Sequence, residues 1–200
     1  MKITLTENLK QKPDFKNLGF GKYFTDHMLY MEYVDGKWGE VEIRPFSDIA
    51  VNPASVVFHY GQEIFEGMKA YKNTDGKITM FRPRDNILRM NRSAKRLCMA
   101  ELPVDEVLEG IFELVRIEKD WIPTDPGTSL YIRPTMIANE NFLGVHPSKK
   151  YIFFVILSPV GSYYAHGLEP TRIYVEDVFN RAALGGTGEC KCGGNYAASL

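Results

Sequence analysis

The stretch SLYIRPTMIA, residues 129–138, has the length and apolar content of a buried β-strand, and so has YIFFVILSP, residues 151–159. Earlier in the chain, Asp35-Gly36 and Asp75-Gly76 each separate two runs of alternating apolar and polar residues. Asp-Gly is a preferred two-residue turn between antiparallel strands. The sequence therefore predicts two β-hairpins ahead of the two longer strands.

Helical spacing appears between the second hairpin and the long strands. Residues 85–99 and 105–121 predict helices, and the second carries an apolar stripe made of Val107, Leu108, Ile111, Leu114 and Val115. Asp105, which closely follows Pro103, is the expected N-cap of that helix. Hairpins followed by helices and then by strands are typical of an α+β fold rather than of regular βαβ alternation.

The same pattern suggests how the chain is divided. Residues 1–160 are long enough to bury a core of their own, and we expect them to form one α+β domain. Residues 161–170, rich in glycine and aromatic side chains, are the expected linker. Residues 171–200 would begin a second domain, with residues 171–179 as its first strand.

The composition argues against several classes of protein. With 200 residues, 44% apolar and 24% charged, the chain has the make-up of a soluble globular protein. A net charge of -1 and scattered basic residues give no electrostatic case for nucleic acid or for an anionic membrane. The first residues resemble neither a signal peptide nor a transit peptide, and no apolar run approaches the ~20 residues of a membrane helix. Three cysteines are too few for a disulfide framework and point to a reducing, cytoplasmic setting.

The stretch GGTGECKCGGNYAASL, residues 185–200, places Lys191 among glycines. A phosphate-binding P-loop would need a glycine directly before the lysine and a hydroxyl directly after it, but both neighbours are cysteines. Cys190 and Cys192 lack further ligands at zinc spacing, so no metal site is expected, and a redox role for the pair stays open. A lysine beside closely approaching backbone suits a Schiff base with an aldehyde, usually that of pyridoxal phosphate, although most lysines are solvated surface charges.

Several motifs resemble those of one family and follow one another in the family's order. They are FTDHMLYMEY at 24–33, HYGQEIFEGMKAY at 59–71, RMNRSAKRL at 89–97, SLYIRPT at 129–135, NFLGVHPS at 141–148, LSPVGSYY at 157–164 and ECKCGGNYAASL at 189–200. By these motifs the chain is similar to the branched-chain amino acid aminotransferases, the longer-chain form among the fold-type-IV pyridoxal phosphate enzymes. The resemblance implies a smaller N-terminal domain followed by a larger, cofactor-carrying domain.

The resemblance also implies a reaction and the residues that hold the cofactor. The enzyme would move the amino group between leucine, isoleucine or valine and 2-oxoglutarate, with pyridoxal phosphate in a Schiff base on Lys191. The free amine of Lys191 would then act as base and acid at the substrate's α-carbon. The Tyr196 hydroxyl would contact the phenolic oxygen of the cofactor, and Arg89 would bind its phosphate. Gly193 and Gly194 would let the backbone pass close to the cofactor.

A pocket for these substrates must accept both an apolar side chain and the carboxylate of glutamate. The resemblance implies aromatic walls from Phe24, Tyr60, Phe65, Tyr131 and Tyr163. It also implies that Arg133, on the same strand face as Tyr131, meets the glutamate carboxylate. Independently of any family, an arginine within an otherwise apolar strand is costly to bury, which indicates a ligand or an acidic partner.

The resemblance further implies a homodimer, in which Leu143 and Val145 of one subunit line the active site of the other. Family members continue beyond residue 200, so we expect the chain to be the N-terminal portion of the enzyme and to show little activity as an isolated 200-residue piece. Two alternatives stay open. One is a related fold-type-IV enzyme, either a D-amino acid aminotransferase or an aminodeoxychorismate lyase, and the other is a catalytically incomplete fragment that acts only in assembly.

Overall fold

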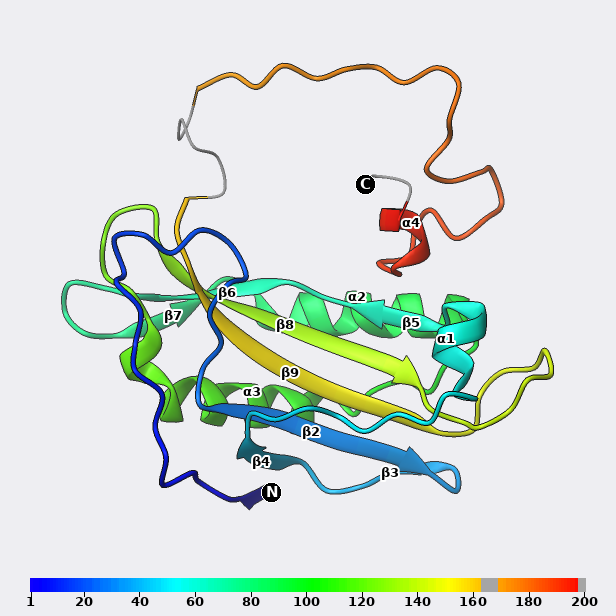
Figure 1. Cartoon of the computed structure of the whole chain (residues 1–200), viewed down its shortest axis with the longest axis horizontal. Helices are drawn as coiled ribbons and strands as arrows, with labels where there is room; N and C mark the ends of the chain where they lie inside the picture. The colour runs from blue at the N-terminus through cyan, green and yellow to red at the C-terminus, as the bar shows by residue number, and fades with distance from the viewer. Residues whose placement is uncertain (163–168, 198–200) are drawn as a thin grey trace.

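The computed structural model describes residues 1–162 and 169–197, and its centre is one mixed sheet (Figure 1). The strands follow the order β1-β4-β2-β9-β8-β6-β7, with β3 paired to β2 and β5 paired to β8. All neighbours are antiparallel except β1 and β4. The strands are β1 (Lys2–Ile3), β2 (His27–Val34), β3 (Lys37–Trp38), β4 (Glu42–Pro45), β5 (Glu63–Phe65), β6 (Met68–Lys72), β7 (Ile78–Met80), β8 (Ser129–Ala138) and β9 (Tyr151–Val160).

The two long strands form the middle of this sheet, as their apolar content predicts. β8 has the predicted bounds and β9 extends one residue further, to Val160. They pair along their whole length, from Ser129 opposite Val160 to Ala138 opposite Tyr151. Both predicted hairpins are confirmed, since β2 pairs with β3 around Asp35 and β6 pairs with β7 across residues 73–77.

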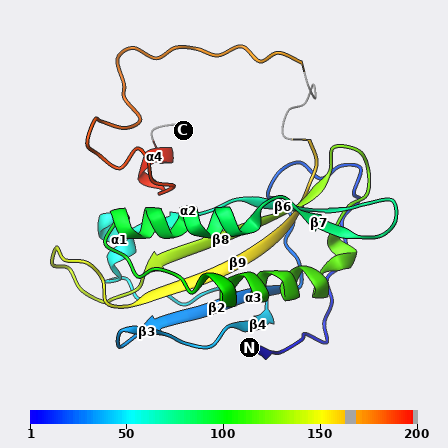
Figure 2. The same ribbon diagram turned by 180° about the vertical axis from the view of Figure 1, so that it is seen from behind.

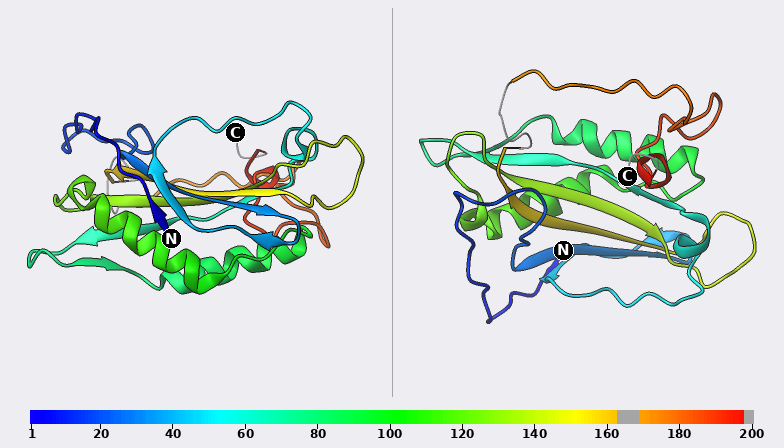
Figure 3. Two further views of the ribbon diagram at one scale, coloured as in Figure 1. Left: turned by 90° about the horizontal axis from the view of Figure 1, so that it is seen from below. Right: turned by 45° about the horizontal axis from the view of Figure 1, so that its top comes forward.

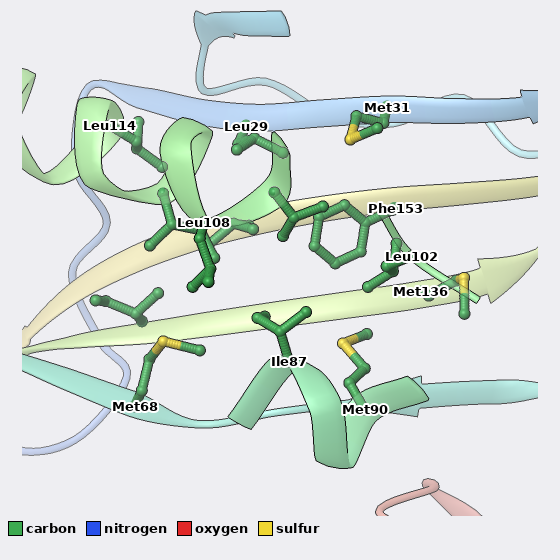
Figure 4. Packing of buried hydrophobic residues seen from close by; sticks show 14 of the residues in the cluster. Leu29, Met31, Met68, Ile87, Met90, Leu102, Leu108, Leu114, Met136 and Phe153 are labelled. Atoms are coloured by element: carbon green, nitrogen blue, oxygen red, sulfur yellow. The ribbon is translucent and has the colours of Figure 1, made fainter. Parts of the chain in front are cut away.

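Two helices, α2 (Pro83–Arg96) and α3 (Val104–Ile117), cover one face of the sheet (Figure 2). The shorter helical segments are α1 (Val56–Tyr60), η1 (Lys119–Trp121) and α4 (Gly194–Ala197). Side chains of α2 and α3 interlock with the sheet in the main core (Figure 4). The labelled residues Ile87, Met90, Leu108, Leu114, Leu29 and Phe153 are all at least 93% buried. The α2/α3 layer thus covers one face of the sheet, and a second, smaller cluster made of Met28, Tyr30 and Ile152 lies outside this core.

The predicted N-cap of α3 is wrong. Pro103, not Asp105, is the residue before the helix, and no side chain caps it. The ring of Pro103 fixes φ at -72° with an extended ψ of 100°, so the helix begins directly after it. Asp105 lies inside the first turn, where its charge suits the helix dipole, and it pairs with Arg84 of α2.

The predicted strand at residues 171–179 is also wrong. The backbone from residue 169 onward stands away from the sheet before the chain returns at α4 (Figures 1 and 3). The side chains of Ile173 and Val175 are 87% and 80% exposed. A strand needs a neighbour for its backbone groups, and no described residue provides one. Within the two described ranges, no helix is both long and apolar enough to span a membrane.

Candidate active site

Lys191 lies where the returning chain meets β5 and α2. Its carbonyl oxygen accepts a hydrogen bond of 2.9 Å from the amide of Phe65, and its own amide donates one of 3.1 Å to Oγ of Ser93. The thiols of Cys190 and Cys192 are 96% buried in the core on either side. The two cysteines therefore act as small apolar anchors, and desolvation raises the pKa of the Cys190 thiol.

The side chain of Lys191 points to two aromatic residues. Its Nζ donates a hydrogen bond of 2.8 Å to Oη of Tyr196. It also lies 4.4 Å from the ring centroid of Phe65 and 4.6 Å from that of Tyr196. The two rings themselves meet edge to face at 4.9 Å. The amine is thus held in place by a hydroxyl and by two ring faces, with no carboxylate paired to it among the described residues.

Arg89 on α2 is fixed by an acidic residue that the sequence analysis did not single out. Its Nε and Nη2 donate to the two carboxylate oxygens of Glu66 at 2.6 and 2.8 Å. Glu66 is fully buried, whereas the Arg89 side chain is 49% exposed. The hydrogen bonds to Glu66 raise the pKa of the Arg89 guanidinium, which stays charged.

Lys191, Arg89 and Tyr196 border one cavity of about 300 Å³. This volume lies at the small end of the range typical of ligand pockets. Larger hollows of about 600 and 720 Å³ lie elsewhere, beside Tyr151 and beside Phe112, but neither is bordered by Lys191. The structure therefore brings together the three residues expected to hold a cofactor, although their roles stay predictions.

Arg133 and Tyr131 share one face of β8, as the two-residue period of a strand requires. Nε and Nη2 of Arg133 both donate to Oη of Tyr131, at 3.2 and 3.0 Å. The guanidinium lies 4.7 Å from the ring centroid of Phe65, so Phe65 lies beside both Arg133 and Lys191. No described carboxylate forms an ion pair with Arg133, which leaves its charge available to a ligand.

Glu63 is a second acidic residue that the sequence analysis missed. Its carboxylate lies against Gly193, where an added Cβ would come within 1.7 Å of Oε1. Gly193 is therefore required by the carboxylate of Glu63, and not only by a cofactor as the sequence suggested. Burial raises the pKa of the Glu63 carboxyl above its ordinary 4.5, while the Gly193 amide and the charge of Arg133 oppose the rise.

We expect Glu63→Gln to raise stability at neutral pH. Because the folded-state pKa exceeds the unfolded one, the ionised carboxylate costs stability above both values, and the cost disappears as the pH falls toward 4.5. The free energy of unfolding of the variant should therefore exceed that of the wild type at pH 7, and the two should converge near pH 4.5. Urea titrations across this range measure the difference, with the exposed Glu109→Gln as control. A variant less stable than the wild type at pH 7 contradicts the prediction.

The other predicted pocket residues make their contacts away from Lys191. Phe24 stacks on Phe46 at 5.3 Å, and the hydroxyl of Tyr60 donates to the carbonyl oxygen of Leu143. Leu143 and Val145 are 62% and 87% exposed. Tyr163, expected in the pocket wall, lies outside the described residues. Of the predicted wall, the structure therefore places only Phe65 and Tyr131 in contact with the site cations.

Among solved structures, the chain is similar to the branched-chain amino acid aminotransferase of T.th., complexed with N-(5'-phosphopyridoxyl)-L-glutamate. The TM-score is 0.57 at 25% identity, covering 84% of this chain and 52% of that one. A branched-chain amino acid aminotransferase from Escherichia coli gives a TM-score of 0.55 at 25% identity, covering 88% of this chain and 52% of that one. The mixed sheet with its α2/α3 layer is thus the fold of the fold-type-IV aminotransferases.

Sequence comparison finds relatives of higher identity. The chain is 53% identical over 193 residues to branched-chain-amino-acid transaminase 1 of Bacillus subtilis (strain 168), covering 96% of this chain and 54% of the relative. It is 50% identical over 201 residues to branched-chain-amino-acid aminotransferase 2 of the same organism, covering 100% and 55%. No family model matches. The chain is therefore homologous to branched-chain amino acid aminotransferases over its whole length and spans about half the length of these curated relatives.

Proposed function

We propose that the protein containing this chain is a pyridoxal-phosphate-dependent aminotransferase that moves the amino group between leucine, isoleucine or valine and 2-oxoglutarate. One observation carries the proposal: the amine of Lys191 is hydrogen-bonded to Tyr196 and borders the same cavity as the guanidinium of Arg89. An amine, a phenol and a fork-shaped cation match the aldehyde, the phenolic oxygen and the phosphate of the cofactor.

The residues of the cavity fit pyridoxal phosphate chemically. When bound, this group supplies an aldehyde and a ring that stabilises negative charge at the α-carbon of an amino acid. The N–H groups of Arg89 that do not bond to Glu66 would hold the phosphate, and the Tyr196 hydroxyl would hold the phenolic oxygen. The free amine of Lys191 would move a proton at the substrate's α-carbon, acting first as base and then as acid.

The dual substrate specificity is assigned to the face of β8 and β5. Phe65 and Tyr131 provide apolar surface for the side chains of leucine, isoleucine and valine, with Phe24, Tyr60 and Tyr163 completing the wall in the proposal. Arg133 binds the side-chain carboxylate of glutamate and of 2-oxoglutarate. No described carboxylate lies at ion-pair distance from Arg133, although its charge acts on the Glu63 carboxyl from further away. The absence of a described ion pair supports this role, because such a pair would compete with the substrate.

The domain division and the assembly also belong to the proposal. Residues 1–160 form the smaller domain, residues 161–170 the linker, and residues 171–200 begin the larger domain. The described strands all lie within residues 1–160, which supports this division. In a cytoplasmic homodimer, Leu143 and Val145 would enter the partner's site, and their exposure of 62% and 87% leaves them free to do so.

The proposal is tested by the spectrum of the intact protein with pyridoxal phosphate. We expect a visible imine absorption, which borohydride reduction abolishes while fixing the cofactor covalently on the peptide that contains Lys191. Assays with leucine, D-alanine and aminodeoxychorismate then compare the three substrate classes, and turnover of leucine with 2-oxoglutarate should dominate. A protein that stays colourless with added cofactor, or that prefers D-alanine, contradicts the proposal.

A further inference from the structure

Glu66 is a fully buried carboxylate directly after β5, and the proposed chemistry does not itself use it. Its two oxygens accept hydrogen bonds from Nε and Nη2 of Arg89, from Nδ2 of Asn86 at 3.0 Å and from the amide of Gly67 at 3.1 Å. Oε1 accepts one of these bonds and Oε2 accepts three, so both oxygens of the buried carboxylate have donors. The amide of Glu66 donates to the carbonyl of Pro134 at 2.8 Å, which fixes its backbone to β8 as well.

These contacts determine which edge of the Arg89 guanidinium is free. A guanidinium carries five N–H groups in one plane. Glu66 takes the N–H of Nε and one N–H of Nη2, and among the described residues no other bond to Arg89 occupies the two groups on Nη1 or the second group on Nη2. The side chain is 49% exposed and borders the cavity that Lys191 and Tyr196 also border. The unused edge presents a second fork of donors, which matches two oxygens of a phosphate.

We propose that Glu66 is a positioning residue, which holds Arg89 so that the free edge of its guanidinium binds the phosphate of the cofactor. The inference rests on the proposed function, because it names how one part of that cofactor is held. The positioning role also explains why a buried carboxylate lies beside a cation that binds an anion. Without such a role, the negative charge of Glu66 would only weaken anion binding by Arg89. Without the acid, the long arginine side chain would sample many rotamers, and ordering it on binding would oppose affinity.

The Glu66 variants should bind ligands differently depending on whether Glu66 only stabilises the fold or positions Arg89. Structural damage at Glu66 would weaken every ligand of the cavity alike. Loss of positioning would instead weaken only ligands that carry a phosphate. Pyridoxal and pyridoxal phosphate differ in that single group, so the ratio of their dissociation constants separates the two roles without any assay of transamination.

The experiment measures these two dissociation constants for the intact wild type, for Glu66→Gln and for Glu118→Gln, by absorbance titration of the apoprotein. Glu118 is the matched control, because it is 97% buried and pairs with His27 at 2.6 Å, but it makes no contact with Arg89. For Glu66→Gln we expect binding of pyridoxal phosphate to weaken about tenfold or more, the size typical when the partner that orients a ligand-binding side chain is lost. Binding of pyridoxal should stay within about twofold, and Glu118→Gln should leave the ratio of the two constants unchanged.

Glu66→Asp is the second variant, in case the glutamine variant fails to fold. It keeps the charge but withdraws the carboxylate from Arg89, so it should also lose affinity for pyridoxal phosphate selectively. Inorganic phosphate is an independent probe, because it should raise the thermal midpoint of the wild-type apoprotein and raise that of either Glu66 variant less.

Three outcomes overturn the inference. An equal loss for pyridoxal and pyridoxal phosphate makes Glu66 structural, and unchanged binding of both makes it irrelevant. An equal phosphate-induced rise in thermal midpoint for the wild type and the variants would also show that Glu66 does not position Arg89. A wild type that responds to phosphate selectively through Glu66, but never forms an imine with pyridoxal phosphate, contradicts the proposed function and keeps the positioning role.

Discussion

Replacing Lys191 with alanine is expected to abolish transamination in the intact protein. The amine is the only described lysine at the cavity, and general acid–base catalysis by one positioned group contributes up to about ten-thousand-fold. We therefore expect turnover of leucine with 2-oxoglutarate to fall by about that factor or more, measured by coupled assay. The visible imine absorption should disappear as well.

The fold of this variant should be intact, because the backbone of Lys191, not its side chain, makes the bonds to Phe65 and Ser93. Thermal unfolding of the apoprotein checks this expectation. Lys77→Ala is the matched control, since its side chain is 79% exposed on the β6–β7 turn. Undiminished turnover in Lys191→Ala would place the chemistry elsewhere in the protein.

Replacing Arg133 with methionine is expected to separate the two substrate classes. Methionine can fill the space beside the rings of Phe65 and Tyr131, so the apolar substrates keep their surface. The carboxylate of 2-oxoglutarate loses a charge-assisted, fork-shaped partner, which should raise its KM about a hundredfold. The KM for leucine should change less than about threefold.

Steady-state kinetics with each substrate varied in turn measures both constants. Arg92→Met on the exposed face of α2 is the control, because it makes the same substitution at a position that does not border the cavity. An equal rise of both KM values would show that Arg133 supports the pocket as a whole and does not bind the carboxylate specifically.

Local pattern is sufficient to predict the elements that depend on neighbours in sequence. The strand at residues 129–138 is recognised from its own apolar residues, and Asp35-Gly36 specifies its own turn. The strand expected at 171–179 has a similar pattern but no described partner, and a sheet is a property of at least two segments. Pattern therefore predicts the capacity to form a strand, whereas pairing is decided by the rest of the fold.

The residues of the candidate site likewise fall into those that the sequence predicts and those that only the tertiary structure shows. Resemblance to a family predicts Lys191, Arg89 and Tyr196 as site residues, and the structure brings them to one cavity. The sequence does not predict Glu66 and Glu63 as site residues, because nothing in the sequence shows that a glutamate is buried. Glu66 bonds to Arg89, which is 23 positions away in sequence. Glu63 contacts Gly193, which lies close to it only because the C-terminal part of the chain folds back onto β5. These contacts depend on tertiary structure, and no local signal contains them.

The backbone of Lys191 is bonded to β5 and to α2, so we expect the cofactor to bind only to correctly folded molecules. Ser93 and Lys191 are 98 positions apart, so the bond between them exists only once distant parts of the polypeptide have found each other. Incompletely folded or damaged molecules, which lack the bond between Ser93 and Lys191, have the same lysine but no ordered residues around its amine. Colour would then mark the properly matured fraction of a preparation and distinguish it from the remainder.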